Sequence, residues 1–500
     1  MYRDTKNGQS DIYDFILPFG GHLKEDNRWV VLRNKINWSV IDEEYSKSFE
    51  NKDSGQEAYS SDVAFGSLYI QRRLKLTDRE LVEQIAENPY MQYFIGYKEY
   101  CNEKPFDASL LVTFRKRLPE ETMCRIIERM FVKPAGDDKS DKGSDGDSGR
   151  NIQNDSNASS GNTKQANKGT VIIDATCAPA DIAYPTDLEL CDKARKWTEV
   201  ILDHFWLSFG SVNGKQEKPR TYREVARRRF LLLNKRRKKS PKKIRKEIRF
   251  QLGCIHRNLE NIHAYTALYG SEKLFRIERE RLSTIETFYQ QQKEMLDSKS
   301  HIVEDRIVSL SQPWIRPIVR GKAKARTEFG AKISVSVVNG YTFIDRFSFD
   351  AYNEGEFNEF RRIIEEYHRR FGHYPARVLA DKIYRSLENR SYCKVLGIHL
   401  SGPKLGKPGK NHAEEIRQEL REIGERNAVE GKFGNGKRKL GLSLVMAKLK
   451  ETTGAMIAMD IFILNMERLI KSGACSLYAF LQMMSTWDIF YKIYVEVSVS

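Results

Sequence analysis

Residues 331–349, AKISVSVVNGYTFIDRFSF, decide the fold class of this 500-residue chain. Apolar and polar residues alternate with a period of two on both sides of Asn339 and Gly340. An Asn-Gly pair between two such runs favours a tight two-residue turn. The pattern therefore predicts two antiparallel β-strands joined as a hairpin.

A helix and two more short strands are predicted downstream of the hairpin. The run RVLA at 377–380 is predicted to be a strand that ends on Asp381, and a helix over 385–396 leads to a last short strand near 398–400. Between the hairpin and RVLA, residues 354–371 carry apolar residues at helical spacing. The apolar face of this helix consists of Phe357, Phe360, Ile363 and Tyr367.

Another strand is predicted far upstream of the hairpin. Thr170–Ala175 (TVIIDA) is rich in β-branched residues and ends on Asp174. Elements in this order form a mixed sheet of the ribonuclease H-like type, so the predicted fold class is α/β. Residues 185–312 are predicted to be a large helical insertion after the first strand.

The predicted insertion contains a run of positive charge. Between Lys215 and Arg249 there are 17 Lys and Arg residues against three acids, so this run holds nearly all of the chain's formal charge of +16. Charge runs exposed only to water normally alternate in sign. The run therefore predicts contact with DNA phosphates, with another anionic surface or simple solvation as the alternatives. The predicted contact residues are Arg227, Arg228, Arg229, Lys235, Arg236, Arg237, Lys238 and Lys239.

The first 135 residues are predicted to form a helical DNA-binding or dimerisation domain. Apolar residues recur at helical spacing after Asp78, and a second helix begins near Asp107 and is interrupted at Pro119. Residues 136–168 contain a single large apolar residue and are predicted to be a flexible, disordered linker. Three adjacent cations on the second helix predict contact with the DNA backbone, with a solvated helix face as the alternative; they are Arg115, Lys116 and Arg117.

The composition favours a polyanionic partner, because 84 Lys and Arg residues outnumber 68 Asp and Glu residues. The seven cysteines form no CxxC pair, and an odd number fits no closed disulfide framework, so reduced thiols are expected. No secretory signal is recognisable, and no apolar tract reaches the ~18 residues of a membrane span. A soluble intracellular protein without a membrane partner is therefore expected.

Asp174 and Asp381 follow predicted strands of the same sheet. Adjacent strands can bring such carboxylates together, and a divalent cation relieves their repulsion. Mg²⁺ prefers one or two carboxylates with phosphate oxygens and water, and two such ions ~3.5–4 Å apart promote phosphoryl displacement. Taken singly, an aspartate at a strand end is more often a turn former or a helix cap.

A third acid is expected on the last predicted helix of this region. If the segment RNAVEGKFGNGKRKLGL at 426–442 is helical, Arg426, Glu430 and Lys437 lie on one face. The glycines at 431, 434 and 436 disfavour a helix by ~1 kcal/mol each, so a Gly-rich loop between two helices is the alternative.

The same segment contains an apparent phosphate-binding loop. Residues 431–437 spell GxxxxGK, but Arg438 stands where Ser or Thr is needed to hold Mg²⁺. The preceding residues are predicted to be helix rather than strand. An ATPase of this type is therefore excluded.

Together these residues resemble a known family, the DDE insertion-sequence transposases with an InsH-type amino-terminal domain. The front module is similar through FDASLLVTFRKR at 106–117. The catalytic domain is similar through TVIIDAT, EFGAKISVSVVNGYTFIDRFSFDAYNE, VLADKIY, IHLSGPKLGKP and VEGKFGNGKRKLGL. The resemblance covers most of the chain outside the linker.

The resemblance implies a catalytic triad of Asp174, Asp381 and Glu430 that holds two Mg²⁺ or Mn²⁺ ions. The family's carboxy-terminal signature of Tyr, Arg, Glu and Lys corresponds to Arg426, Glu430 and Lys437, with Ile423 at the position of the tyrosine. Arg426 and Lys437 are accordingly expected to contact DNA.

The implied function is a transposase that binds the inverted-repeat ends of its element as double-stranded DNA, cuts beside them and joins freed 3′-hydroxyls to target DNA. A homo-oligomer is expected because two ends are joined together, and the expected location is the cytoplasm, on the nucleoid. The alternatives are a metal-dependent nuclease and a catalytically inactive DNA-binding protein derived from a transposase. The predicted catalytic domain spans 169–470, followed by a tail, 471–500, that does not resemble the family.

Overall fold

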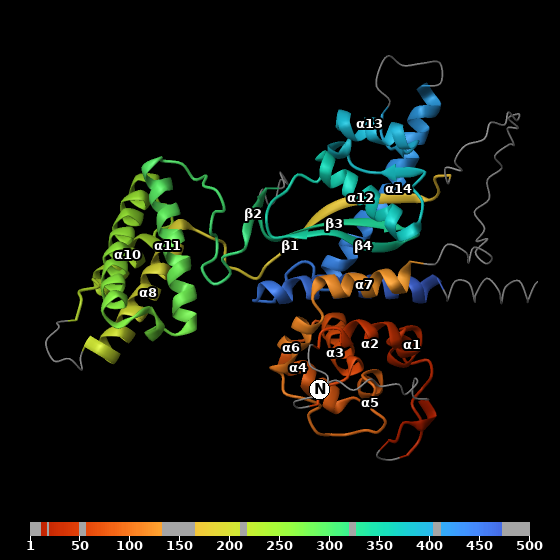
Figure 1. Ribbon diagram of the computed structural model, residues 1–500, viewed down its shortest axis with the longest axis horizontal. Helices are drawn as coiled ribbons and strands as arrows, with labels where there is room; N and C mark the ends of the chain where they lie inside the picture. Colours follow the sequence, from red (N-terminus) through yellow and green to blue (C-terminus); the bar gives the residue numbers. More distant parts are fainter. Residues whose placement is uncertain are drawn as a thin grey trace, which may run out of the picture.

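The computed structural model describes residues 12–17, 20–49, 57–132, 166–210, 218–319, 327–403 and 412–472. The chain forms three parts: an amino-terminal group of helices, a mixed sheet packed against helices, and a separate helical bundle (Figure 1). Most of the predicted linker (136–168) and of the predicted tail (471–500) lies outside the described residues. Among the helices that the structure describes, none has the length and apolarity needed to span a membrane.

The amino-terminal part is helical, as predicted. Thr77 and Glu80 cap the fourth helix reciprocally, since each side chain accepts the backbone N–H of the other residue. Pro119 interrupts the predicted second helix, which forms two helices on either side of it. The elements are η1 (Ile12–Asp14), α1 (Arg28–Lys35), α2 (Trp38–Ser46), α3 (Ser61–Leu74), α4 (Asp78–Glu87), α5 (Pro89–Phe94), α6 (Leu110–Arg117) and α7 (Glu120–Phe131).

The predicted hairpin forms β3 (Thr327–Val338) and β4 (Tyr341–Ser348) of one sheet. Asn339 and Gly340 have φ angles of 52° and 80°, the positive values that a type I′ turn requires. The sheet is mixed, as predicted: its order is β2-β3-β1-β5-β6, with β4 beside β3, and β1 is antiparallel to β3 and parallel to β5. The other strands are β1 (Thr170–Pro179), β2 (Arg316–Val319), β5 (Arg377–Leu379) and β6 (His399–Leu400).

Strand β1 is longer than predicted, and Asp174 lies in its middle rather than at its end. The strand continues because its second half pairs with β3, from Asp174 opposite Val335 to Pro179 opposite Gly330. Pairing with the parallel neighbour β5 stops at Ile172, two residues before Asp174. The predicted end of the strand was therefore wrong, and Asp174 lies just beyond the end of the parallel pairing.

Helix α14 (His412–Lys439) covers one face of the sheet. Val429 and Phe433 of α14 pack against Val335 of β3, with Ile172 of β1 at the margin of the same cluster. The predicted helix after the hairpin is α12 (Phe357–Phe371), whose residues Phe360, Ile363 and Tyr367 are buried as expected. It is followed by η4 (Lys382–Tyr384) and α13 (Leu387–Leu396).

The amino-terminal helices and the sheet share one hydrophobic core. A helix over residues 450–472 lies between them, and Phe65 of α3 and Phe131 of α7 pack against its Phe462 at centroid distances of 5.0 and 5.7 Å. Arg72 of α3 forms a buried ion pair with Asp460 of the same helix. Figure 1 shows α7 running beside the sheet. The two parts are therefore coupled, although the proposed boundary near residue 135 lies between them.

The third part is a bundle of helices that lies between β1 and β2 in the sequence. It has its own core, which includes Phe205, Ile255 and Phe288. Two chain segments, 180–186 and 298–315, join it to the sheet, and the bundle stands apart from the sheet in Figure 1. Its elements are α8 (Asp187–Phe205), the π-helix η2 (Trp206–Gly210), α9 (Arg223–Asn234), α10 (Pro241–Tyr269), η3 (Ser271–Lys273) and α11 (Arg276–Asp297).

Candidate functional site

Asp174 lies in β1, and Asp381 follows the neighbouring parallel strand β5 by two residues, at the start of η4. β1 and β5 pair up to Ile172 and Leu379, and two further residues along each chain bring Asp174 level with Asp381. The carboxyl ends of β5 and β6 meet at the same edge, where α/β sheets usually bind their ligands. The register thus places the two aspartates side by side, and their joint role in catalysis stays a prediction.

The carboxylate of Asp381 has two donors beside it. Its Oδ1 accepts the backbone N–H of Lys382 at 2.7 Å and lies 2.9 Å from Nη1 of Arg426. Partial burial would raise the pKa of Asp381, but the Lys382 N–H and the Arg426 guanidinium hold this pKa below its usual value. Asp381 is therefore ionised at neutral pH and available to a cation.

Tyr384 is a site residue that sequence reasoning missed. Its side chain is 1% exposed, and its hydroxyl has no hydrogen-bond partner among the described residues. Burial is the main cause that raises the pKa of Tyr384 well above its usual value, and the negative charge of Asp174 is the second. The phenol is thus neutral and lies within the electrostatic reach of Asp174. The available signal was its place in the turn directly after Asp381.

Helix α14 runs without interruption through the glycines at 431, 434 and 436. The predicted helix is confirmed, and the alternative of a Gly-rich loop is wrong. The segment that spells GxxxxGK therefore lies within a helix, which agrees with the exclusion of a phosphate-binding loop. Glycine's low helix propensity is offset because Val429 and Phe433 of the same helix are buried against the sheet.

The glycines at 431, 434 and 436 of α14 are expected to respond differently to alanine. A Cβ at Gly431 or Gly434 would meet nothing within 4 Å, so alanine is expected to stabilise the protein by ~0.5–1 kcal/mol at either position. A Cβ at Gly436 would lie 2.5 Å from Leu442 Cδ1 and 3.3 Å from Leu464 Cδ1, so alanine is expected to destabilise it by ~1–3 kcal/mol. Thermal unfolding of the single variants measures both effects. A Gly436→Ala protein as stable as Gly431→Ala would refute the close packing of α14.

The predicted third acid, Glu430, is exposed on α14. Within the described part of the chain, no three His, Cys, Asp or Glu side chains lie close enough together to hold a metal ion. Asp174 and Asp381 alone suit Mg²⁺, which takes one or two protein carboxylates and fills its other positions with water and phosphate oxygens. The chemistry of these two carboxylates suits a divalent ion, and the prediction that they hold one, with or without Glu430, stays a prediction.

A shallow pocket opens beside Asp381, between the ends of β5 and β6 and helix α14. Its lining includes Lys382, Ser401, Glu422 and Arg426 as well as Asp381. Ser401 Oγ accepts the backbone N–H of Ala380, which fixes the chain just before Asp381. The pocket offers both a carboxylate and cations, a combination that suits a phosphate group bound next to a metal ion.

The predicted DNA contact by Arg115 does not fit its position. Arg115 is 7% exposed, and its guanidinium donates 3.0 and 3.2 Å hydrogen bonds to Gln71 and Asp78. A buried, hydrogen-bonded guanidinium is not available to phosphate. Lys116 pairs with Glu451 at 3.3 Å across an exposed surface, and Arg117 lies 4.4 Å above the ring of Phe49. For these two the predicted contact stays untested.

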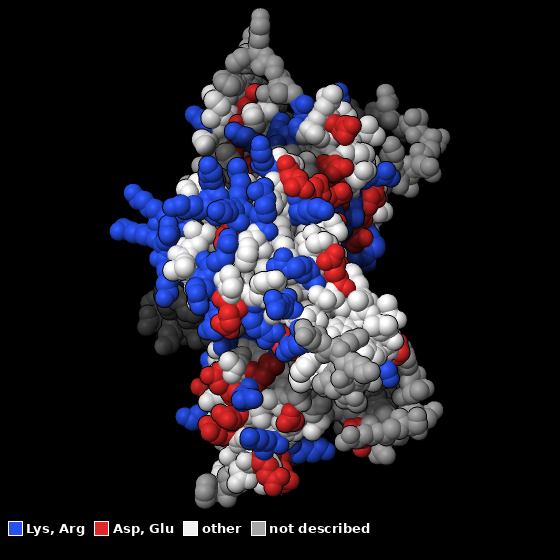
Figure 2. All heavy atoms as spheres, turned by 90° about the vertical axis from the view of Figure 1, so that its left-hand side faces the viewer, with Lys and Arg blue, Asp and Glu red and all other residues white. Residues whose placement is uncertain are grey.

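The basic run forms a continuous surface on the bundle, which Figure 2 shows as a dense field of Lys and Arg side chains. Arg229 pairs with Glu247 at 3.1 Å, and Lys239 donates to Asn234 at 2.6 Å, so these two predicted contact residues also have structural roles. Nearer the start of the run, Lys218 and Arg223 pair with Asp203. The other cations between Arg227 and Arg249 are exposed and form no ion pair with any carboxylate that the structure describes. We call them the basic surface; they are Arg227, Arg228, Lys235, Arg236, Arg237, Lys238, Lys242, Lys243, Arg245, Lys246 and Arg249.

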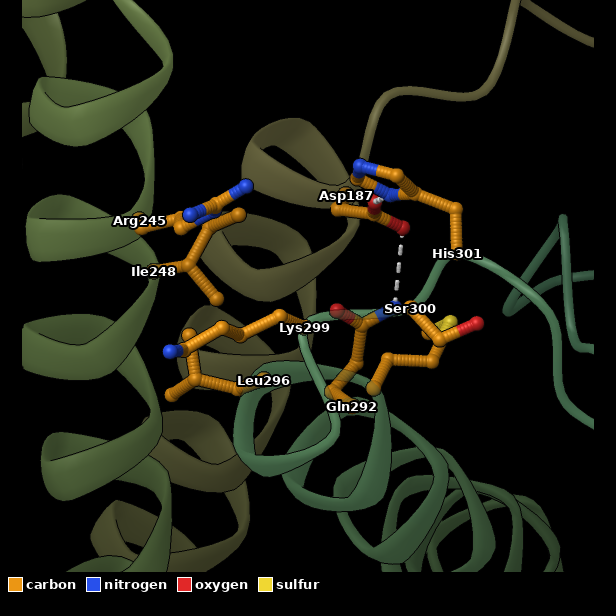
Figure 3. A pocket seen from close by; sticks show the side chains of 9 residues that line it. Asp187, Arg245, Ile248, Gln292, Leu296, Lys299, Ser300 and His301 are labelled. Carbon is orange, nitrogen blue, oxygen red and sulfur yellow. Dashed lines mark hydrogen bonds and ion pairs between the residues drawn. The ribbon is translucent and has the colours of Figure 1, made fainter.

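Another pocket lies inside the bundle, between α8, α10 and α11 (Figure 3). Asp187 at the start of α8 accepts hydrogen bonds from Gln292 at 3.0 Å and Arg306 at 2.7 Å, and His301 Nδ1 lies 3.6 Å from it. Arg245 lines the wall contributed by α10. These contacts tie the segment after α11 back to α8, which gives the pocket a structural role.

Two parts of the chain match known protein families. Residues 378–467 match the family described as transposase DDE domain, and residues 18–117 match the family described as transposase domain (DUF772). A protein of Rhizobium meliloti described as "Uncharacterized protein ORF8 in nfe locus" is 28% identical over 165 residues, which are 33% of this chain and 68% of that protein. No solved structure matches the chain. The first match includes Asp381, Arg426, Glu430 and Lys437, and the second includes the α6 cations.

Proposed function

We propose that this chain, a member of the DDE insertion-sequence transposases, binds the ends of its element and cleaves and joins DNA strands. The observation that carries this proposal is that Asp174 and Asp381 each lie two residues beyond the last parallel pair of β1 and β5, next to the helix that carries Arg426 and Glu430. In this proposal the sheet is ribonuclease H-like, and the bundle is its helical insertion. The InsH-type character of the amino-terminal part stays a prediction.

Each proposed catalytic residue has a defined task. Asp174 and Asp381 would hold a divalent ion, Mg²⁺ or Mn²⁺, which lowers the charge barrier to attack on phosphorus and activates the attacking oxygen when bound. Arg426 holds the carboxylate of Asp381 and faces the pocket in which a phosphate would lie. Glu430 and Lys437 follow Arg426 on α14, at positions that would complete the ion site and contact the DNA backbone.

A joining assay tests the proposal. The substrates are labelled duplexes from the flanks of the encoding locus, ending in either a 3′-hydroxyl or a 3′-dideoxy nucleotide, mixed with a target plasmid and Mg²⁺. The proposal predicts labelled target DNA from the 3′-hydroxyl substrate alone, because only that substrate carries the attacking oxygen. Cleavage without joining by the wild-type protein would favour the metal-dependent nuclease, and binding without cleavage the inactive DNA-binding protein.

The basic surface is proposed to contact the DNA backbone. Replacing Arg227, Arg228 and Lys235 by glutamine is expected to reduce the slope of log affinity against log salt by roughly 3, since each lost phosphate contact removes ~0.9. The measurement is fluorescence anisotropy of labelled duplex DNA over a range of salt concentrations. The matched control replaces three exposed cations elsewhere on the bundle, Lys273, Arg276 and Arg279. Equal slopes for the two triple variants would place the DNA on another face.

Partners and location follow from the same proposal. The partner is double-stranded DNA, both the ends of the element and a target, and the protein would act on the nucleoid in the cytoplasm. Joining two ends in one event requires two active sites, so a homo-oligomer is proposed.

A further inference from the structure

Two leucines interrupt the basic surface on helix α9. Leu231 is 40% exposed and Leu232 is 62% exposed, whereas Ala226 and Leu233 of the same helix are buried. Leu231 and Leu232 lie between Arg228 and Lys235, at the spacing i, i+3, i+4 and i+7 that places residues on one helix face. The outward face of α9 is thus apolar at its centre and cationic at both ends.

Helix α9 packs against the bundle through other residues than these two leucines. Ala226 and Leu233 are 0% and 8% exposed, and Phe230 packs partly against the same core. Isolated exposed leucines are common on protein surfaces, but an adjacent pair inside a field of one charge is not explained by folding. This face therefore needs a partner that tolerates both apolar contact and dense positive charge.

Charge decides which partner suits this face. A second copy of the chain would present the same cations, so two such faces repel each other. Duplex DNA is complementary, because phosphates flank stacked bases whose faces accept apolar side chains. Proteins that kink DNA insert leucine or similar wedges between base steps while Lys and Arg hold the phosphates on either side.

We propose that Leu231 and Leu232 form an apolar wedge that enters duplex DNA at a deformable base step while Arg228 and Lys235 hold the flanking phosphates. The wedge unstacks one step and kinks the duplex. This proposal rests on the proposed function only in taking duplex DNA as the partner. It adds a distortion of DNA by the bundle, away from the sheet that carries Asp174 and Asp381.

The test measures base unstacking by the full-length protein in EDTA, so that strand cleavage is not needed. The probes are duplexes with 2-aminopurine in a central TA step, which is easily deformed, and matched duplexes with 2-aminopurine in a stiff A-tract. Wild type is expected to raise the fluorescence of the TA probe several-fold and that of the A-tract probe much less. Förster transfer between labels on the two duplex ends reports the accompanying bend.

The Leu231→Ala/Leu232→Ala variant is expected to lose the fluorescence increase and the bend while keeping the salt slope of wild type. The matched control is Leu268→Ala, a leucine 66% exposed near the end of α10 and outside the basic surface, which should behave as wild type. An unchanged fluorescence increase in the double leucine variant would overturn the proposal. Binding of the TA probe by the wild-type protein without a fluorescence increase would also overturn the proposal. A third contradicting result would be a double leucine variant that loses the fluorescence increase because its oligomeric state, measured by light scattering, has changed.

This test and the joining assay fail independently. A protein that unstacks DNA through the leucines but joins nothing would keep the wedge and lose the transposase activity. A protein that joins DNA with wild-type efficiency after loss of both leucines, and never unstacks it, would keep the activity and lose the wedge.

Discussion

Replacing Asp381 by asparagine is expected to lower the rate of DNA strand cleavage at least ~10³-fold, because a carboxylate that holds a catalytic ion is worth several kcal/mol in the transition state. Asparagine keeps the size and hydrogen-bonding shape of the side chain but removes its charge. The affinity for DNA is expected to stay within about twofold of wild type, since the basic surface lies on the separate bundle. Single-turnover cleavage of an end-containing duplex measures the rate.

Asp174→Asn is expected to match Asp381→Asn, because each residue lies two positions beyond the last parallel pair of β1 and β5 and the two would share one ion. The control is Asp350→Asn, which removes an exposed acid with a side chain 73% accessible. Control activity should equal that of wild type. Cleavage by either Asp174→Asn or Asp381→Asn at a rate near wild type would refute the assignment of that aspartate.

Replacing Asp460 by asparagine is expected to destabilise the protein by ~3–5 kcal/mol, the usual effect of removing one partner of a buried ion pair. Asp460 is 0% and Arg72 6% exposed, and the guanidinium donates to both carboxylate oxygens, with Nε 2.8 Å from Oδ1. Burial raises the pKa of Asp460 and Arg72 opposes that shift. The substitution leaves the Arg72 cation buried without its counter-charge. Urea unfolding followed by tryptophan fluorescence measures the loss.

Two controls separate the buried pair from ordinary contacts. Lys116→Met removes an exposed ion pair with Glu451, which lies on the same helix as Asp460; the two side chains are 49% and 69% accessible. This substitution is expected to change stability by less than ~1 kcal/mol. The double variant Arg72→Met/Asp460→Leu replaces the pair by apolar residues and should recover most of the lost stability. A loss below ~1 kcal/mol in Asp460→Asn would contradict the coupling of α3 to the helix over 450–472.

Local sequence patterns predicted the elements whose structure depends on near neighbours. The hairpin around Asn339 and Gly340, helix α12 and the strand before Asp381 were all predicted because alternation, turn residues and helical spacing are visible within ~20 residues. The helical nature of α14 was predicted only conditionally, because its glycines disfavour helix locally. Burial of Val429 and Phe433 against the sheet decides that question, and the sequence does not display this contact.

Features that depend on distant partners were missed. The end of β1 was placed at Asp174 because residues 176–179 have little strand character, yet pairing with β3 extends the strand. Arg115 was taken with its neighbours as a surface cation, whereas its partner Asp78 lies 37 residues upstream. The shared core of the amino-terminal helices and the sheet depends on Phe462, far from both in sequence.

In the candidate site, too, the sequence predicted the order of the elements but not the contacts between distant residues. The order of motifs predicted that Asp174 and Asp381 belong to one sheet, and the register brings them level. The ion pair between Asp381 and Arg426, the buried hydroxyl of Tyr384 and the exposure of Glu430 follow from the packing of α14 and η4 on the sheet. The order of residues placed Tyr384 near Asp381 and Arg426 on the last helix, but it did not reveal the ion pair, the burial of the hydroxyl or the exposure of Glu430.

The measurement that tests the central claim most directly is Mn²⁺ binding, followed by electron paramagnetic resonance, in wild type, Asp381→Asn and Asp350→Asn. The claim is that Asp174 and Asp381 together hold the ion. It predicts a saturable site in wild type and in Asp350→Asn, with affinity at least ~10-fold weaker in Asp381→Asn. Equal Mn²⁺ affinity in all three proteins would contradict the claim.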